Sequence, residues 1–335
     1  MEKHYNIPVF LPELACPFRC VYCNQSAISG HDAAPSVLEM RAVIESRLST
    51  IPIGASDVEI AFFGGNFTGL PTSYQEFCLR LANSYMSSGR VKGIRISTRP
   101  DFITQHAVRF LKQWNVRTIE LGAQSFDDEV LVKSGRGHNA ADVHNASDMI
   151  RAEGLRLGLQ MMIGLPGDSL SSSLTTAQKI IEAGADETRI YPCLVIADTE
   201  LEEQFKNGIY QALPLQDAIE WSAELYLLFE RAGVKVIRMG LFPSDELRSY
   251  GYIAGPFHPA FKELVMTHIW KKLFEKTQWP EAKAIRIEVP VSERNFAIGY
   301  KAVNKKNLTE RYEKVSFHAA DLPHRDHFTI HIEKL

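Results

Sequence analysis

Short apolar segments alternate with longer amphipathic ones over most of this chain. Seven runs rich in apolar and β-branched residues have the length of strands. They resemble parallel strands buried on both faces more than strands with one wet face. The predicted strands are Tyr5–Leu11, Val58–Phe63, Gly93–Ser97, Thr118–Gly122, Arg156–Ile163, Glu187–Val195 and Val234–Met239.

The segments between these strands carry helix start and stop signals. Ser36 with Glu39, and Ser73 with Glu76, have the spacing of capping boxes. A glycine ends four helical patterns just before a strand, where a left-handed residue is needed. These glycines are Gly89, Gly154, Gly184 and Gly233. Repeated β–α units predict a parallel sheet that is closed or nearly closed as a barrel, with an open doubly wound sheet as the alternative.

The pattern changes at Tyr250–Pro259, which contains glycine and proline. A helix is predicted over Pro259–Phe274, followed by strands at Ile285–Val289, Phe296–Tyr300 and Phe328–Ile332. The prediction is therefore a barrel over residues 1–245 and a small C-terminal α+β extension over residues 246–335.

Composition narrows the class of protein. The 335 residues are 45% hydrophobic and 23% charged, which is typical of a soluble globular protein with a sizeable core. No basic segment precedes an apolar run at the N-terminus, and no apolar stretch is long enough to span a membrane. The five cysteines are an odd number and three of them crowd together, which favours metal chemistry in a reducing cytoplasm over disulfides.

Cys16, Cys20 and Cys23 have the spacing C-x₃-C-x₂-C and directly follow the first predicted strand. In a barrel this is the C-terminal mouth, where active sites are built. Three thiolates can hold three irons of a 4Fe–4S cluster, whereas most such clusters take four cysteines. One iron is then open to an external chelator.

An open iron is what radical chemistry on S-adenosylmethionine requires. The methionine part chelates that iron, the reduced cluster donates an electron to the sulfonium, and the C5′–S bond breaks to give a 5′-deoxyadenosyl radical that abstracts hydrogen from a substrate. Two alternatives remain. A structural zinc site needs a fourth ligand, for which Cys78, Cys193, His4 and His31 are poorly placed. Three buried structural cysteines are the other alternative.

Polar or glycine residues end several of the predicted strands. Gly64 and Gly65 close the second strand, where backbone can approach a ligand, although a glycine pair also suits a tight turn. Glu120 lies at the end of the fourth strand, where it can hold ribose hydroxyls or form a structural ion pair with Arg99 or Arg136. Met162 can support an adenine ring and Cys193 can face the substrate, but both residues are better explained as core residues.

Several longer strings accompany these features, and together they resemble the radical S-adenosylmethionine domain of the elongator catalytic subunit and its bacterial relatives. The resemblance runs from about residue 5 to 243 and includes Tyr22 before the last cysteine. Its strings are Gly64-Gly65-Asn66-Phe67-Thr68-Gly69-Leu70-Pro71, Ser97-Thr98-Arg99-Pro100-Asp101, Gly122-Ala123-Gln124-Ser125, Gly135-Arg136-Gly137-His138, Met161-Met162-Ile163-Gly164-Leu165-Pro166-Gly167 and Tyr191-Pro192.

The resemblance implies a partial (β/α)6 barrel of the TIM type with a 4Fe–4S cluster and S-adenosylmethionine at its mouth. Gly64, Gly65 and Asn66 would meet the methionine amino group. Ser97, Glu120, Gln124 and Arg136 would surround the ribose and carboxylate. The adenine would be lined by Tyr22, Met162–Leu165 and Tyr191–Cys193.

The substrate stays open. Residues 244–335 lack the acetyl-CoA loop of the elongator subunit's acetyltransferase domain, so its tRNA reaction is not carried over. The sequence predicts a radical enzyme that acts on a nucleoside, an RNA or a small molecule. A donor such as flavodoxin or ferredoxin would supply its electrons. An iron–sulfur electron-transfer or redox-sensing protein is the alternative. Weak nucleic-acid binding is expected, because the net charge is −3 and residues 286–314 hold seven basic against four acidic residues.

Overall fold

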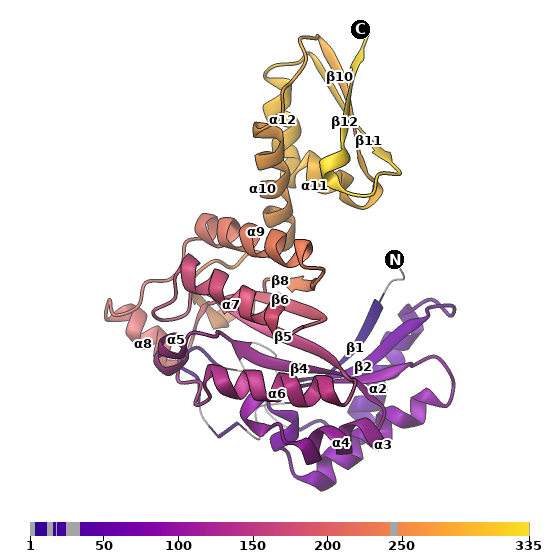
Figure 1. Ribbon diagram of the computed structural model, residues 1–335, viewed down its shortest axis with the longest axis vertical. Helices are drawn as coiled ribbons and strands as arrows, with labels where there is room; N and C mark the ends of the chain where they lie inside the picture. Colours follow the sequence, from indigo (N-terminus) through magenta and orange to yellow (C-terminus); the bar gives the residue numbers. More distant parts are fainter. Residues whose placement is uncertain (1–3, 12–15, 18, 25–33, 242–246, 335) are drawn as a thin grey trace.

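A seven-stranded, fully parallel sheet forms the larger part of the molecule (Figure 1). The computed structural model describes residues 4–11, 16–17, 19–24, 34–241 and 247–334. The strand order is β1-β2-β3-β4-β5-β6-β8, and the sheet curls into a half-barrel rather than an open doubly wound sheet. Its strands are β1 (His4–Leu11), β2 (Asp57–Gly64), β3 (Gly93–Thr98), β4 (Val116–Gln124), β5 (Arg156–Ile163), β6 (Glu187–Pro192) and β8 (Lys235–Met239).

Helices connect these strands and cover the outer face of the sheet with a continuous apolar core. They are α2 (Val37–Thr50), α3 (Thr72–Met86), α4 (Gln105–Gln113), α5 (Asp128–Lys133), α6 (Ala140–Ala152), α7 (Leu170–Glu182), α8 (Glu200–Lys206) and α9 (Leu215–Arg231). None of the helices in the described part of the chain is long and apolar enough to cross a membrane.

The helix signals in the sequence are mostly confirmed. Ser36 and Glu39 form a capping box at the start of α2. The four glycines that were expected to end helices all have positive φ, between 69° and 75°. The second capping box is wrong, because α3 begins at Thr72 after Pro71 and has no side-chain cap.

The concave face of the half-barrel is charged. Arg95 on β3 is fully buried and contacts Glu59 on β2, Glu120 on β4 and Glu187 on β6. Burial alone would lower the pKa of Arg95, but the hydrogen bond and charge of Glu187, with Glu120 and Glu59, raise it above its usual range. The ion pair with Glu187 therefore joins β3 to β6, two strands that are not neighbours in the sheet.

The C-terminal part forms a second lobe above the half-barrel (Figure 1). Its sheet has the order β11-β10-β12, with β10 (Ala284–Pro290), β11 (Lys314–Ala320) and β12 (Thr329–Glu333). Its helices are α10 (Phe261–Glu275), α11 (Arg294–Ile298) and α12 (Val303–Thr309). A small antiparallel pair is formed by β7 (Val195–Ile196), which follows β6 in the chain, and β9 (Tyr252–Ala254), which follows β8.

Two strand predictions need correction. Phe296–Tyr300 is helical, since α11 and a 3₁₀ turn occupy it. The strand predicted over Glu187–Val195 ends at Pro192, after which Cys193 donates its backbone N–H to Ile163 and Val195 pairs with β9. The strand β11 was not predicted.

Helix α10 belongs to two apolar cores. Val265 and Ile269 pack in the core of the half-barrel, whereas Trp270 and Phe274 pack in the core of the C-terminal lobe. Arg325 adds a buried ion pair across the same junction, with Glu230 on α9 and Glu293. The domain boundary predicted between residues 245 and 246 stays a prediction.

Candidate active site

The cysteine loop, which contains Cys20 and Cys23, lies at the carboxyl end of the sheet and contacts two other segments. Val21 donates its backbone N–H to Ser134 at 3.1 Å, and Leu201 at the start of α8 donates to the carbonyl of Val21 at 2.8 Å. Cys23 donates to the carbonyl of Cys20 at 3.0 Å, which closes a tight turn between the two cysteines. Cys20 is buried, Cys23 is half-buried and Cys16 is exposed.

The three thiols are not grouped as the ligands of one metal site. Among the described residues, no three Cys, His, Asp or Glu side chains are grouped closely enough to hold a metal ion. Cys16 is separated from Cys20 by Phe18, which lies outside the described residues, as do residues 12–15 before it. The assignment of Cys16, Cys20 and Cys23 as cluster ligands therefore stays a prediction.

Arg136 joins the cysteine loop to the end of β4. Its guanidinium donates to Cys20 Sγ at 3.3 Å and to the carbonyl of Gly122 at 2.6 Å. Burial alone would lower the pKa of Arg136, but the nearby Tyr22 and Cys20 raise it above its usual range. The sequence placed Arg136 in the site but directed it toward the cofactor's ribose and carboxylate, and it did not indicate the contact with Cys20.

Several side chains converge on Gly122. A Cβ built there would lie 2.9 Å from Gln124 Nε2, 3.3 Å from Arg136 Nη2 and 3.9 Å from the carbonyl of Thr98. Gln124 itself has a φ of 66°, a left-handed conformation that a non-glycine residue adopts at a cost of order 1 kcal/mol or more. The ends of β3 and β4 and the loop after α5 thus meet around Gly122, where an added Cβ would require the side chain of Gln124 to move.

His138 was part of a family string but had no predicted role. Its Nε2 lies 3.2 Å from the carbonyl of Ala123, which also accepts from Ser125 N–H at 2.9 Å. Burial, with the charge of Arg136, lowers the pKa of His138 to about 3, so its ring is neutral near pH 7. A neutral ring can donate only from one nitrogen, and this contact holds the backbone just before Gln124.

Buried polar atoms without partners test whether the site fits the expected cofactors. Within the described residues, Ser97 Oγ, Gln124 Oε1 and Tyr22 Oη are buried and have no hydrogen-bond partner. Buried polar atoms normally have partners, so unpaired ones at the ends of neighbouring strands suit a polar ligand. Ribose hydroxyls and a methionine ammonium or carboxylate supply the donors and acceptors that these atoms lack. The residues present therefore fit S-adenosylmethionine.

The glycine pair at the end of β2 has a clear structural reason. Gly64 has a φ of 116°, and a Cβ there would lie 2.1 Å from the carbonyl of Leu11. Gly65 donates its N–H to the same carbonyl at 2.9 Å. Asn66 is buried, and its side-chain oxygen accepts from Thr98 Oγ1 at 2.6 Å. These contacts place the β2 end against β1 and β3, while contact with the methionine amino group stays a prediction.

Glu120 is engaged by neighbours other than those expected. Both of its oxygens accept hydrogen bonds, from Arg95, Arg189 and Gln160. Burial would raise its pKa, but Arg189 and Arg95 lower it below the usual value. The expected ion pair with Arg99 or Arg136 is wrong, because Arg99 pairs with Asp101 and Arg136 contacts Cys20. The role of Glu120 at the ribose stays a prediction.

The residues expected at the adenine lie next to one another. Met162 and Tyr191 are paired in register on β5 and β6. Tyr22 and Met162 pack on an apolar cluster that contains Val21 and Cys193. Cys193 is fully buried, and burial raises the pKa of its thiol to about 12, which agrees with a core residue.

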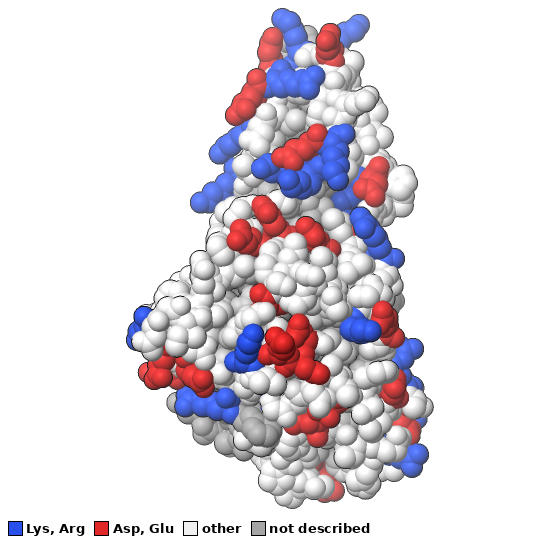
Figure 2. Space-filling model, turned by 60° about the vertical axis from the view of Figure 1, so that its left-hand side comes forward, with Lys and Arg blue, Asp and Glu red and all other residues white. Residues whose placement is uncertain are grey.

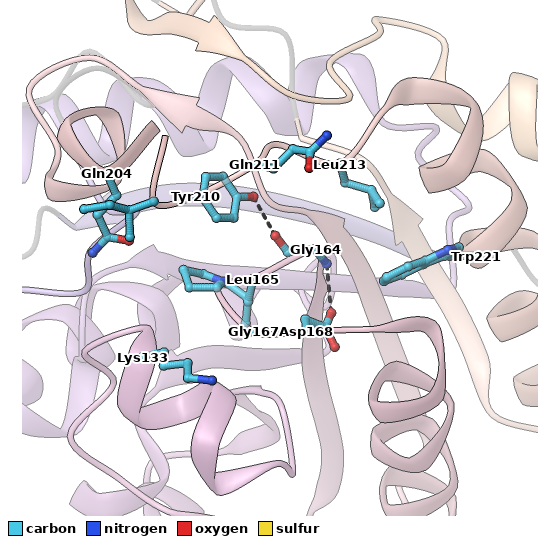
Figure 3. A pocket seen from close by; sticks show the side chains of 12 residues that line it. Lys133, Gly164, Leu165, Gly167, Asp168, Gln204, Tyr210, Gln211, Leu213 and Trp221 are labelled. Atoms are coloured by element: carbon cyan, nitrogen blue, oxygen red, sulfur yellow. Dashed lines mark hydrogen bonds between the residues drawn. The ribbon is translucent and has the colours of Figure 1, made fainter. Parts of the chain in front are cut away.

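A cavity of about 660 Å³ is lined on one side by the loop that follows β5 (Figure 3). Tyr210 donates to the carbonyl of Gly164 at 2.6 Å, and Gly164 donates its N–H to Asp168 at 2.8 Å. Lys133 and Trp221 line other parts of the wall. Of the predicted adenine contacts, only Gly164 and Leu165 reach this cavity, so it is separate from the convergence around Gly122.

A half-barrel of parallel strands with a cysteine loop and unpaired polar groups at its carboxyl edge defines the class of radical S-adenosylmethionine barrels. The family comparisons agree. The Radical SAM superfamily matches residues 14–180, and the Radical_SAM C-terminal domain matches residues 185–271. The chain belongs to the radical SAM superfamily and is an enzyme that uses a 4Fe–4S cluster and S-adenosylmethionine.

Similar proteins include tRNA uridine(34) acetyltransferase of Methanocaldococcus infernus, which is 29% identical over 203 residues, covering 55% of this chain and 38% of the relative. Human Elongator complex protein 3 is 26% identical over 211 residues, covering 57% and 38%. The chain thus spans about two fifths of the length of these two relatives.

Two solved structures share the fold. The archaeal Methanocaldococcus infernus Elp3 with an N-terminal deletion has a TM-score of 0.65 at 23% identity, covering 81% of this chain and 64% of that one. Coproporphyrinogen III oxidase from Escherichia coli has a TM-score of 0.50 at 15% identity, covering 69% and 54%.

Proposed function

We propose that this chain cleaves S-adenosylmethionine reductively at the carboxyl edge of the half-barrel and uses the product to abstract hydrogen from a polar substrate. The observation that carries the proposal is that Ser97 Oγ, Gln124 Oε1 and Tyr22 Oη are buried and unpaired within the described part of the chain, at the ends of β3 and β4 and in the cysteine loop. When bound, the cluster and S-adenosylmethionine supply one-electron cleavage of the C5′–S bond, which releases methionine and a 5′-deoxyadenosyl radical.

The chain's own residues bind, orient and shield. Cys16, Cys20 and Cys23 would hold the cluster, and Arg136 would fix Cys20. Ser97 and Gln124 would hold polar groups of the cofactor from two neighbouring strands.

The concave face below this edge is where a substrate would lie. It presents Arg189, whose guanidinium stacks over the ring of Phe63 at 4.9 Å. A charged and aromatic surface of this kind favours a polar substrate, such as a nucleoside, an RNA or a polar small molecule, over an apolar one.

The test is anaerobic reconstitution with iron and sulfide, reduction with dithionite, and detection of 5′-deoxyadenosine and methionine. We expect stoichiometric or greater amounts of both products. A protein that takes up a 4Fe–4S cluster but leaves S-adenosylmethionine intact would support the alternative, an electron-transfer or redox-sensing protein. That alternative has no use for the unpaired polar atoms at the strand ends.

Ser97→Ala is expected to separate cofactor binding from stability. The substitution removes a buried hydroxyl without a partner, so the free energy of unfolding of the apoprotein should stay the same or rise by about 1 kcal/mol. The dissociation constant for S-adenosylmethionine should rise about tenfold, the value of one hydrogen bond. Urea denaturation and equilibrium binding measure the two effects.

Ser222→Ala is the matched control. Ser222 on α9 is also buried and its hydroxyl also lacks a partner among the described residues, but it lies outside the site. Its substitution should change stability in the same direction and leave cofactor affinity unchanged. Equal affinities of the wild type and Ser97→Ala for S-adenosylmethionine would show that Ser97 does not bind the cofactor.

Binding to nucleic acid is expected to be weak. Lysine and arginine gather on the C-terminal lobe, but acidic side chains lie among them (Figure 2). Arg286 pairs with Glu288, Lys314 with Glu333, and Lys272 with Glu275. Lys305 and Lys306 on α12 are exposed and add to the surplus of positive charge.

Bulk tRNA should therefore bind with a log–log salt slope of about −2 to −3, because two or three phosphates are engaged at about −0.9 each on duplex. Filter binding across a salt series measures this slope. A much steeper slope that is lost in a Lys305→Glu/Lys306→Glu variant would contradict the expectation and point to an RNA substrate.

A further inference from the structure

Arg136 is a buried cation, and no carboxylate in the described part of the chain forms an ion pair or a hydrogen bond with it. The residue is 7% exposed, and its guanidinium contacts Cys20 Sγ and the carbonyl of Gly122. The titratable groups with the largest effect on its pKa are Tyr22, Cys20 and Cys23. A buried charge of this kind is costly unless a charge of opposite sign lies nearby. The cysteine loop is where that charge would be.

The backbone holds this side chain in place from several directions. Gly135 and Gly137, on either side of Arg136, have φ values of 65° and 71°, so the chain turns sharply on both sides of the arginine. Arg136 donates its N–H to Leu131 at 3.1 Å and accepts from Arg99 Nη2 at 2.5 Å. The guanidinium is therefore positioned before any cluster binds.

The charge of the expected cluster matches this arrangement. A 4Fe–4S cluster with three thiolate ligands is a net anion and becomes more negative when it is reduced. A fixed cation in a surrounding of low dielectric stabilises the more negative state, and hydrogen bonds to the sulfurs act in the same direction. The guanidinium of Arg136 is both a fixed cation and a hydrogen-bond donor to Cys20 Sγ.

We propose that Arg136 positions Cys20 and raises the reduction potential of the cluster by a charge-assisted N–H···S hydrogen bond to Cys20 Sγ. This inference rests on the proposed function. It gives Arg136 a role toward the cluster itself, whereas the family resemblance placed it at the ribose and carboxylate of the cofactor. Arg136 is a positioning residue, because it acts on the reacting centre through Cys20.

The test compares reduction potentials of reconstituted protein, measured by redox titration with electron paramagnetic resonance in the absence of S-adenosylmethionine. Arg136→Gln removes the charge, and Arg136→Lys keeps it without the two-pronged geometry. At one applied potential, the ratio of reduced to oxidised cluster should fall about tenfold in Arg136→Gln, which is about 59 mV for one electron. In Arg136→Lys the same ratio should fall about threefold.

Lys133→Gln is the matched control, because Lys133 is a cation on the adjacent α5 whose side chain is 55% exposed. Solvent screens its charge, so the ratio should not change. A ratio in Arg136→Gln equal to that of Lys133→Gln would overturn the proposal, even if iron content fell, since a purely structural role lowers occupancy and not potential.

If Arg136→Gln takes up no cluster, the ratio of reduced to oxidised cluster in Arg136→Lys tests the proposal instead. A ratio below that of the wild type supports the proposal, and a ratio equal to it overturns the proposal. A wild-type protein that takes up no 4Fe–4S cluster would defeat the proposed function itself. A wild-type protein that cleaves S-adenosylmethionine, with potentials that do not depend on Arg136, would defeat only this inference.

Discussion

Cys20→Ala is expected to reduce the iron content of the reconstituted protein from about four per chain to background and to abolish cleavage of S-adenosylmethionine. The three cysteines leave no spare thiolate nearby, since Cys193 is fully buried with a pKa raised to about 12 by burial. Loss of Cys20 also leaves Arg136 without its sulfur partner. Iron and sulfide analysis, the visible absorption of the cluster and product detection measure the effect.

Cys78→Ala is the control for this experiment. Cys78 is also a fully buried cysteine, but it lies on α3 in the core of the half-barrel. Its substitution should leave about four irons per chain and cleavage at the level of the wild type. A full cluster in Cys20→Ala would show that the ligand assignment is wrong.

Arg95→Met is expected to lower the free energy of unfolding by about 3–5 kcal/mol, because it removes the cation that three buried carboxylates share. Glu120 keeps Arg189 and Glu187 keeps Arg156, so the network is left with one negative charge in excess. Methionine fills much of the volume of the arginine, so the loss reports charge more than packing. Arg95 is fully buried and contacts Glu59, Glu120 and Glu187. Urea denaturation of the apoprotein measures the loss at about pH 7.5, which is about one unit above the ordinary pKa of histidine.

The loss should shrink as the pH falls. The variant holds a buried negative charge without a counter-charge, so the folded state should bind protons more readily than the unfolded chain, and its stability should fall as the pH rises. Arg109→Met is the control, because Arg109 pairs with Glu153 at the surface and its side chain is 65% exposed. Its stability should match that of the wild type. Equal stabilities for Arg95→Met and the wild type would show that the network contributes nothing.

Features that depend on neighbours in the chain were predicted well from the sequence. The seven parallel strands were located to within a few residues, because each is a short run rich in apolar and β-branched residues. The capping box at Ser36 and the left-handed Gly154 follow from local backbone requirements. The cysteine spacing indicated the cofactor because three thiols within eight positions have few other uses.

Local patterns misled the prediction in the C-terminal lobe. The apolar residues Phe296, Ile298 and Tyr300 alternate as in a strand, but short windows do not separate strands from helix turns, and α11 forms there. In β11, Val315 and Phe317 are buried, whereas Lys314 and His318 are exposed and Ser316 is half-buried. That alternation marks a strand with one buried face and would have identified it.

Contacts between distant parts of the chain were decided only by the tertiary structure. Arg136 and Cys20 are 116 positions apart, and Arg95 and Glu187 are 92 apart. Several arginines and glutamates lie on the inner face of the sheet, so the sequence offers many pairings of similar chemistry. Strand register and the curl of the half-barrel select among them. The sequence by itself therefore determined the cofactor class and the strands, while the packing of those strands determined which charges meet and which polar atoms are left for a ligand.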